Sequence, residues 1–213
     1  MRIRAAGALV LIVIGTAAGP MARAGEPDLS SPKAAAASLY QAMQAQDEQA
    51  ILKIFYAPQK ADRDLAQAYA DLIVAGKKLA DAAKEKYGAA NEAIGAGTIG
   101  VEGLAQLDRA EVKSTGDTAT LTIPGQTKTV TFHRTGDRWQ IVLSDFAGTA
   151  EGGTSRQVVL LKKVSEALSD TAAEIQAGKC PTAQAAEASI QGKLARVMIR
   201  AATQASTRPA TKP

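Results

Sequence analysis

One glycine-rich segment has the residue types and spacing of a nucleotide-binding site. Gly95, Gly97 and Gly100 match the G-x-G-x-x-G fingerprint of dinucleotide-binding proteins. In those proteins a strand precedes the glycines and a long helix follows them, so that the N-terminus of the helix faces the pyrophosphate. Here the preceding residues have a helical pattern and only a short segment follows. We therefore interpret the glycines as a connector and predict no cofactor.

The single cysteine and the single histidine are the other residues that could supply a nucleophile, a base or a metal ligand. Cys180 precedes Pro181 between two predicted helices, whereas His133 follows Phe132 in a predicted strand. A catalytic pair needs both side chains within hydrogen-bond reach, and one histidine alone makes neither a metal site nor a triad. We interpret Cys180 as a small buried residue and His133 as pointing away from the core. The sequence predicts no catalytic or metal-binding residue and leaves open whether the protein is an enzyme.

The start of the chain, residues 1–24, has the three parts of a bacterial secretory signal peptide. Two arginines form a positive beginning, residues 5–18 are apolar apart from glycine and one threonine, and residues 22–24 (Ala-Arg-Ala) are the pattern that signal peptidase recognises. We expect cleavage near Ala24 and a mature protein that is periplasmic or secreted. A permanent membrane anchor is the weaker alternative, because a crossing helix needs about 20 apolar residues.

Charge composition argues against nucleic acid as a partner. The chain has 25 Lys and Arg against 21 Asp and Glu, and the expected signal peptide contains three of the arginines and no acidic residue. The mature chain is therefore nearly neutral, with 22 basic residues against 21 acidic ones. A nucleic-acid-binding protein needs a dense basic face, so we predict no nucleic-acid partner.

Helical patterns occupy the first part of the mature chain, over residues 32–94. Ser31-Pro32 is typical of a helix start, with serine as the N-cap and proline at the first helical position. Asp47 can cap a second, short helix that ends at Ala57-Pro58. From about residue 62 to 87 apolar residues recur at i, i+3, i+4 and i+7, which predicts a long amphipathic helix.

From residue 110 the apolar period changes to 2, which predicts strands separated by turns and joined in an antiparallel meander. The predicted strands are 110–115, 117–123, 127–134 and 138–144. Two further helices are expected within 155–203, and 204–213 is expected to be a disordered tail. The predicted class is α+β, a single domain over 25–203 in which N-terminal helices pack on a four-stranded antiparallel meander, followed by two C-terminal helices.

Two segments resemble exported members of the nuclear transport factor 2-like superfamily (SnoaL-like, cystatin-like cone domains). They are the opening helix pair, Ser31 to Phe55, and the closing strand Gly136 to Ile141, with the sequence GDRWQI. The resemblance covers about residues 30–147 and implies helices seated in the hollow of a curved antiparallel sheet. That superfamily includes isomerase-like enzymes, dehydratases, ligand binders and non-enzymatic domains, so the fold does not choose among functions. No catalytic residue of the isomerase type can be matched here.

Three hypotheses for function follow from the sequence. The first is a non-catalytic binding or scaffolding domain of the cell envelope, because no cluster of titratable residues has the pattern of a site. The second is a small-molecule pocket, with or without catalysis, in the concave face of the sheet near Tyr40, Tyr69, Phe132 and Trp139. The third is assembly with a protein partner through the C-terminal helices, which an exposed apolar patch favours. An unfilled cavity with convergent polar groups favours the pocket hypothesis.

Overall fold

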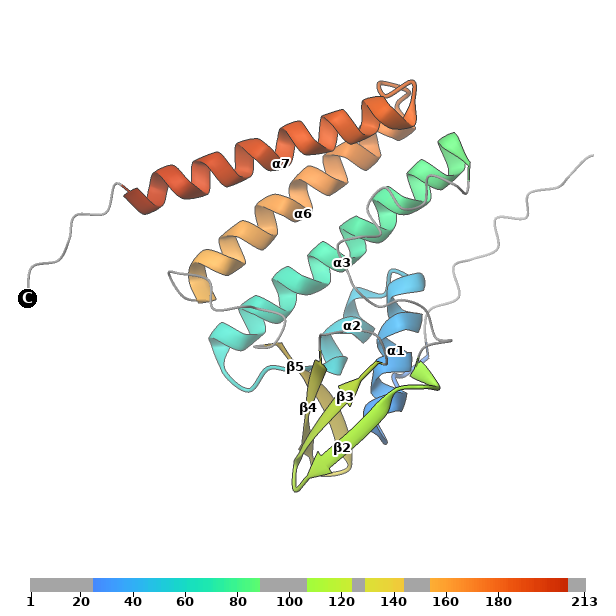
Figure 1. Ribbon diagram of the computed structural model, residues 1–213, viewed down its shortest axis with the longest axis vertical. Helices are drawn as coiled ribbons and strands as arrows, with labels where there is room; N and C mark the ends of the chain where they lie inside the picture. The colour runs from blue at the N-terminus through green and yellow to red at the C-terminus, as the bar shows by residue number, and fades with distance from the viewer. Residues whose placement is uncertain (1–24, 89–106, 124–128, 144–153, 207–213) are drawn as a thin grey trace, which may run out of the picture.

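The computed structural model describes residues 25–88, 107–123, 129–143 and 154–206. Figure 1 shows a sheet with short helices against it at one end of the molecule and long helices side by side at the other. The expected signal peptide, the glycine motif and the last seven residues of the expected tail lie outside the described residues.

Side-chain caps set the starts of the first two helices. α1 (Pro32–Gln44) follows Ser31, whose Oγ accepts a 3.1 Å hydrogen bond from the amide three residues on. α2 (Glu48–Ile54) follows Asp47, whose Oδ1 accepts a 3.0 Å hydrogen bond in the same way. Each cap satisfies a backbone N–H group that has no partner within the helix. Both helix starts predicted from the sequence are confirmed.

α3 (Lys60–Tyr87) is the longest of the described elements and joins the two ends of the molecule. It begins two residues before the predicted position, because the Asp62 carboxylate accepts a hydrogen bond from the Gln59 amide at 3.1 Å and caps the helix earlier. It ends at Gly88, whose φ of 90° is a backbone conformation that glycine adopts readily. Its apolar face contributes to both of the buried clusters described below.

The sheet has five strands in the described part of the chain, in the order β1-β5-β4-β3-β2. The predicted antiparallel meander is confirmed; it consists of β2 (Glu111–Thr115), β3 (Thr118–Thr122), β4 (Thr129–Thr135) and β5 (Arg138–Val142). β1 (Phe55–Tyr56) lies parallel to β5, with Phe55 opposite Ile141. The predicted four-stranded sheet is therefore corrected to a mixed sheet of five. Two residues are too few to show the alternation of apolar and polar side chains that predicts a strand. β1 is therefore recognised only from its pairing with β5.

Glycines with positive φ close two tight hairpins of the meander. Gly116 has a φ of 60° in the turn between β2 and β3, and Gly136 has a φ of 61° in the turn between β4 and β5. Two-residue hairpin loops require such backbone angles, because they match the twist of the flanking strands. The β2–β3 turn is also tied to β4, since the Arg134 guanidinium lies 2.9 Å from the Asp117 carboxylate.

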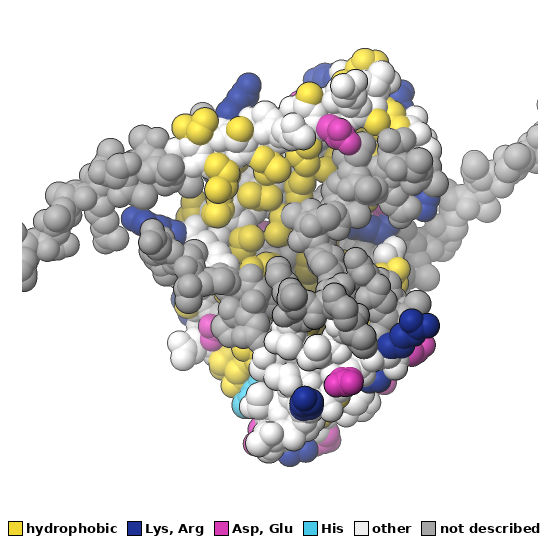
Figure 2. All heavy atoms as spheres, viewed as in Figure 1, with side chains coloured by type: hydrophobic (Ala, Val, Ile, Leu, Met, Phe, Trp, Pro, Cys, Tyr) yellow, Lys and Arg dark blue, Asp and Glu magenta, His cyan; other side chains and the backbone are white. Residues whose placement is uncertain are grey.

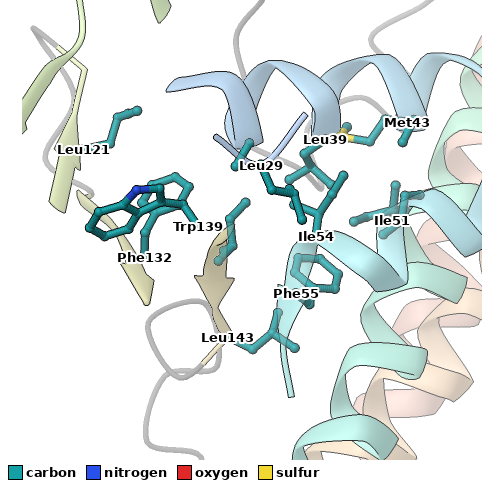
Figure 3. Packing of buried hydrophobic residues seen from close by; sticks show 14 of the residues in the cluster. Leu29, Leu39, Met43, Ile51, Ile54, Phe55, Leu121, Phe132, Trp139 and Leu143 are labelled. Atoms are coloured by element: carbon teal, nitrogen blue, oxygen red, sulfur yellow. The ribbon is translucent and has the colours of Figure 1, made fainter. Parts of the chain in front are cut away.

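The inner face of the sheet packs against α1 and α2 in one apolar cluster. Phe132 and Ile51 are fully buried there. Figure 3 shows helix and strand side chains of this cluster pointing toward one another; the labelled ones are Leu29, Leu39, Met43, Ile51, Ile54, Phe55, Leu121, Phe132, Trp139 and Leu143. The Trp139 amide also donates a 2.7 Å hydrogen bond to the Leu29 carbonyl, which holds the segment before α1 against the sheet.

The C-terminal helices form a second apolar cluster with α3. α6 (Thr154–Gln176) packs along α3, and its Leu168 and Ile175 are almost completely buried. α7 (Ala183–Ser206) packs on α6 (Figure 1). The two predicted C-terminal helices are thus confirmed. In the described ranges, no helix combines the length and the apolar character needed to cross a membrane.

Candidate functional site

The four residues proposed from the sequence as a pocket lining lie in different environments. Phe132 is fully buried and Trp139 is 8% exposed, and both belong to the cluster between the sheet and the first two helices. Tyr69 is half-buried on α3, where Gln157 Nε2 donates to its hydroxyl at 3.4 Å. Tyr40 is half-buried on α1. None of the four lines either of the two cavities considered below.

Cys180 and His133, the two candidate reactive residues, lie in different parts of the described structure. Cys180 is buried, as predicted, and its carbonyl accepts a 2.7 Å hydrogen bond from the Tyr87 hydroxyl. His133 lies on the outer face of the sheet, opposite Gln140 in the register, and its ring centroid is 4.3 Å from that of Tyr56. Within the described ranges, no three or more His, Cys, Asp or Glu side chains are grouped to hold a metal ion.

The larger cavity, which we name the β1 groove, lies at the free edge of β1, where the sheet meets the first turns of α3. Its volume is about 590 Å³, within the range of about 300–1,000 Å³ that is typical of small-molecule sites. A smaller cavity of about 230 Å³ lies beside the first described residues and α2. The β1 groove is lined by Leu52, Phe55, Tyr56, Ala57, Pro58, Arg63, Ala66, Gln67, Thr135 and Gln140.

Gln140 of β5 fixes the edge of the groove. Its Nε2 donates to two backbone carbonyls of the α2–β1 junction, that of Lys53 at 3.0 Å and that of Phe55 at 3.2 Å. These side-chain bonds supplement the short parallel pairing between β1 and β5. The position of β1, and hence the shape of the groove, therefore depends on this one side chain as well as on the strand pairing.

Arg63 and Gln67 supply the polar wall on the side of α3. Arg63 NH1 donates to the Pro58 carbonyl at 2.9 Å, which turns the guanidinium toward the chain after β1. Gln67 Nε2 donates to Glu48 Oε1 at 2.6 Å and to Asp71 Oδ1 at 2.9 Å. Arg63 is the only charged residue among those that line the groove, while the carboxylates of Glu48 and Asp71 lie behind Gln67.

Comparison with family models, with curated proteins and with solved structures finds no match to this chain.

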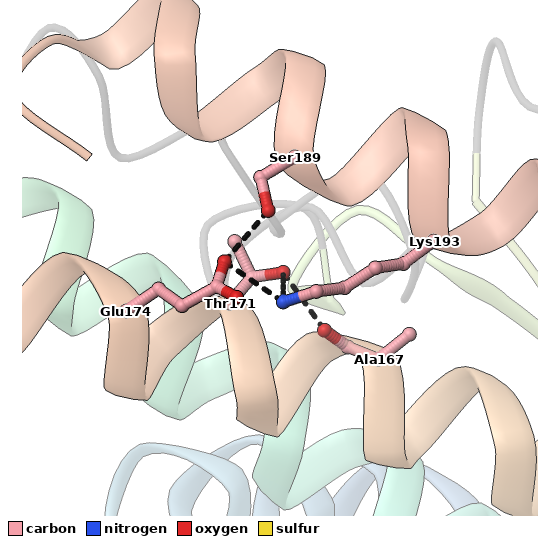
Figure 4. Close-up of polar contacts among 5 residues, drawn as sticks. All are labelled: Ala167, Thr171, Glu174, Ser189 and Lys193. Atoms are coloured by element: carbon pink, nitrogen blue, oxygen red, sulfur yellow. Dashed lines mark hydrogen bonds and ion pairs between the residues drawn. The ribbon is translucent and has the colours of Figure 1, made fainter. Parts of the chain in front are cut away.

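A second feature, the attachment of α7 to α6, depends on a polar network that Figure 4 shows. Glu174 of α6 accepts a 2.7 Å hydrogen bond from the Ser189 hydroxyl, and its carboxylate lies 2.8 Å from Lys193 Nζ. Lys193 also donates to the Thr171 hydroxyl at 3.2 Å, and that hydroxyl donates to the Ala167 carbonyl at 2.8 Å. Hydrogen bonds from Lys193 first and from Ser189 second lower the pKa of Glu174 below its ordinary value.

α7 presents an uncharged exposed side, which we name the α7 face: Ala188, Gln191, Gly192, Ala195, Met198 and Ile199. These residues recur at helical spacing, so they lie along one side of the helix. Met198 is 59% exposed and Ile199 is 65% exposed. Among the side chains of α7 that the structure describes, only Ala186 is buried. Figure 2 shows hydrophobic side chains gathered where α7 and α6 run side by side, in the upper part of the view.

Sequence reasoning did not identify the β1 groove. Its polar residues come from α3 and from the end of the meander, so no local motif joins Arg63 to Gln140. Glutamine at an outward position of a strand is also ordinary on a solvated face. The predicted end of the second helix at Ala57-Pro58 is too late, because α2 ends at Ile54 and Phe55–Tyr56 form β1. Proline restricts the backbone of Ala57 alone, so it does not mark this strand.

Proposed function

We propose that this protein is an exported, non-catalytic scaffolding domain of the cell envelope that assembles through the α7 face with the same face of a second copy. The observation that carries the proposal is the exposure of Met198 and Ile199 on a helix whose described side chains, Ala186 excepted, are not buried. The proposal takes up the first and the third hypotheses from the sequence.

The physical argument starts from how helices are stabilised. In proteins most of the stability of a helix comes from packing of its apolar face rather than from intrinsic propensity. α7 has 24 residues, yet Ala186 is the only one of its described side chains that is buried in the second apolar cluster, with Ala183, Ala185 and Ile190 partly buried against it. The network around Glu174 adds polar contacts to α6. Burial of the α7 face against another helix supplies the missing apolar contact.

A second copy of the chain fits this face better than a charged partner does. Contacts in a two-fold dimer use the same patch on both subunits, so the patch must be complementary to itself. An uncharged helical stripe meets that condition, because no like charges face one another when it pairs with its own copy. The mature chain is also nearly neutral, so the two copies repel each other little.

Export and fold type are parts of the same proposal. The signal-peptide pattern of residues 1–24 supports a periplasmic or secreted location. The packing of α1 and α2 on the inner face of the sheet supports a relationship to the nuclear transport factor 2-like superfamily. The parallel β1 and the layer of α3, α6 and α7 are departures from the pattern that the resemblance implies.

The test is the oligomeric state of the full chain after expression in a bacterial host. We expect a dimer by analytical ultracentrifugation at high micromolar concentration. The double variant A195E/M198E places charges in the α7 face and is expected to be monomeric, because like charges then oppose each other across the two-fold axis. The matched control is Val159→Glu, an exposed site on α6. This control should remain dimeric.

Two results would contradict the proposal. The first is a wild-type protein that stays monomeric at the highest concentration measured. The second is a dimer that A195E/M198E leaves unchanged, because the contact would then involve another surface. Circular dichroism of each variant establishes that loss of the dimer is not loss of the fold.

A further inference from the structure

We propose that the β1 groove binds an N-acylated apolar amino acid, with the guanidinium of Arg63 holding its carboxylate. This inference goes beyond scaffolding and does not involve the α7 face. It rests on three properties of the groove: an apolar floor that the core fixes in place, one cation with uncommitted donors, and two glutamines whose NH₂ groups are already bonded to the protein.

The floor of the groove is part of the folded core. Phe55 is 4% exposed and Ala66 is 2% exposed, and both belong to the cluster between the sheet and the helices. Leu52 of α2 is half-buried and packs against the same cluster. Their positions are therefore set by folding, so an apolar side chain that enters the groove meets a preformed surface. Preorganisation of this kind reduces the entropy cost of binding.

Arg63 is the cation of the groove. Its guanidinium makes a single hydrogen bond in the described part of the chain, from NH1 to the Pro58 carbonyl at 2.9 Å. A guanidinium has five N–H donors in a planar fork, and a carboxylate accepts two of them side by side. The bond to Pro58 orients this fork, while the other donors are left for a ligand.

The acidic residue that follows Arg63 is paired chiefly with Lys60 rather than with Arg63. Asp64 follows it on α3, but its Oδ2 accepts a 2.7 Å hydrogen bond from Lys60. That hydrogen bond is also the main cause of the lowered pKa of Asp64, which stays ionised and paired with Lys60. No acidic residue is among those that line the groove. An anionic ligand group beside Arg63 therefore meets no opposing carboxylate in the lining.

The two glutamines of the lining present acceptors rather than donors. Gln140 Nε2 is committed to the carbonyls of Lys53 and Phe55. Gln67 Nε2 is committed to Glu48 and Asp71. An amide side chain has one NH₂ group and one carbonyl oxygen, so in both residues the oxygen remains to accept a hydrogen bond. A ligand N–H group is the complement of such an acceptor.

These properties together define the ligand class. The apolar floor complements an apolar side chain of the ligand, and Arg63 complements a carboxylate. The glutamine oxygens complement an N–H donor close to that carboxylate. A free amino group would carry a positive charge beside Arg63, which an acylated amine does not. An N-acylated apolar α-amino acid combines all of these groups, and its size suits a cavity of about 590 Å³.

The test is an NMR titration of the ¹⁵N-labelled full chain with N-acetyl-L-leucine, in which ¹H–¹⁵N spectra report binding. We expect saturable shifts for amides of β1 and the start of α3. N-acetyl-L-leucinamide, which lacks the carboxylate, should bind about tenfold or more weakly, as expected for loss of a charge-assisted hydrogen bond. Arg63→Gln should weaken binding of the acid by a similar factor and leave binding of the amide unchanged. Arg156→Gln, at an exposed site on α6, is the matched control and should bind as the wild type does.

Three outcomes would overturn the proposal. They are equal affinity for the acid and the amide, unchanged affinity of the Arg63→Gln variant, and shifts that do not saturate at the solubility limit of the probe. Thermal unfolding of Arg63→Gln establishes that this variant is folded. The same titration on A195E/M198E separates this inference from scaffolding, because the groove should bind equally well whether or not the α7 face pairs.

Discussion

Lys193 Nζ of α7 lies 2.8 Å from Glu174 Oε2 of α6, and this pair is partly buried, with 21% and 32% of the two side chains exposed. Ser189, one turn before Lys193, donates to the same carboxylate. Two residues of α7 therefore converge on one acceptor of α6. Since α7 contributes little to the apolar clusters, this carboxylate is a main point of attachment for the C-terminal helix.

The first prediction concerns the pH dependence of that attachment. The pKa of Glu174 is lowered in the folded protein, so its stabilising contribution is complete above the ordinary glutamate value of about 4.3. It is lost as the pH falls through the lower, folded-state pKa, because the unfolded state then binds the proton more readily. The protection factors of α7 amides, which are the intrinsic exchange rates divided by the observed rates at the same pH, should therefore fall in acid.

Glu174→Gln should accelerate exchange in α7 already at neutral pH and remove much of its acid dependence. Glu187→Gln is the matched control, since Glu187 is an exposed glutamate on α7. It should exchange as the wild type does. Identical exchange profiles for the two variants would show that the Glu174 network does not hold α7.

The second prediction concerns the core between the sheet and the first helices. Phe132 is fully buried on β4, and Phe132→Ala is expected to reduce the free energy of unfolding by about 3–5 kcal/mol. Val159 is 56% exposed on α6, so Val159→Ala should change it by less than about 0.5 kcal/mol. Urea unfolding measures both values. Similar small losses for the two variants would contradict the burial of Phe132.

The third prediction concerns Gln140 as the support of β1. Gln140→Met removes the donor to the Lys53 and Phe55 carbonyls while keeping a side chain of similar length. We expect a loss of about 0.5–1.5 kcal/mol, because two partly exposed carbonyls lose their donor, and faster hydrogen exchange in β1. Gln49→Met, at an exposed site of α2, is the control and should have little effect. Unchanged exchange in β1 would mean that strand pairing alone positions it.

The fourth prediction concerns the turn between β4 and β5. Gly136 has a φ of 61°, and a Cβ atom there would have no heavy atom within 4 Å, so any cost of substitution comes from the backbone. Gly136→Val should cost about 1–2 kcal/mol, as expected for a side chain forced into the left-handed region. Gly136→Asn should cost less, because asparagine tolerates that region. Equal thermal stability of the two variants would contradict this account.

The sequence by itself determined the local elements of this protein. The caps Ser31 and Asp47 marked the helix starts, and the change of apolar period from 3.6 to 2 located the four strands of the meander. Both kinds of signal act over a few residues, through hydrogen bonds and side-chain alternation that neighbouring positions control. They are therefore readable in the sequence before any packing is known.

Only the tertiary structure decided which of these elements contact one another. β1 exists because Phe55 lies beside Ile141, a residue far along the chain. The same packing places Phe132 and Trp139 in the cluster between the sheet and the first helices, and it brings Arg63, Gln67 and Gln140 together around a groove. It also leaves the α7 face exposed. Such contacts join residues that are distant in sequence, and which distant pairs form depends on the collective packing of the whole chain.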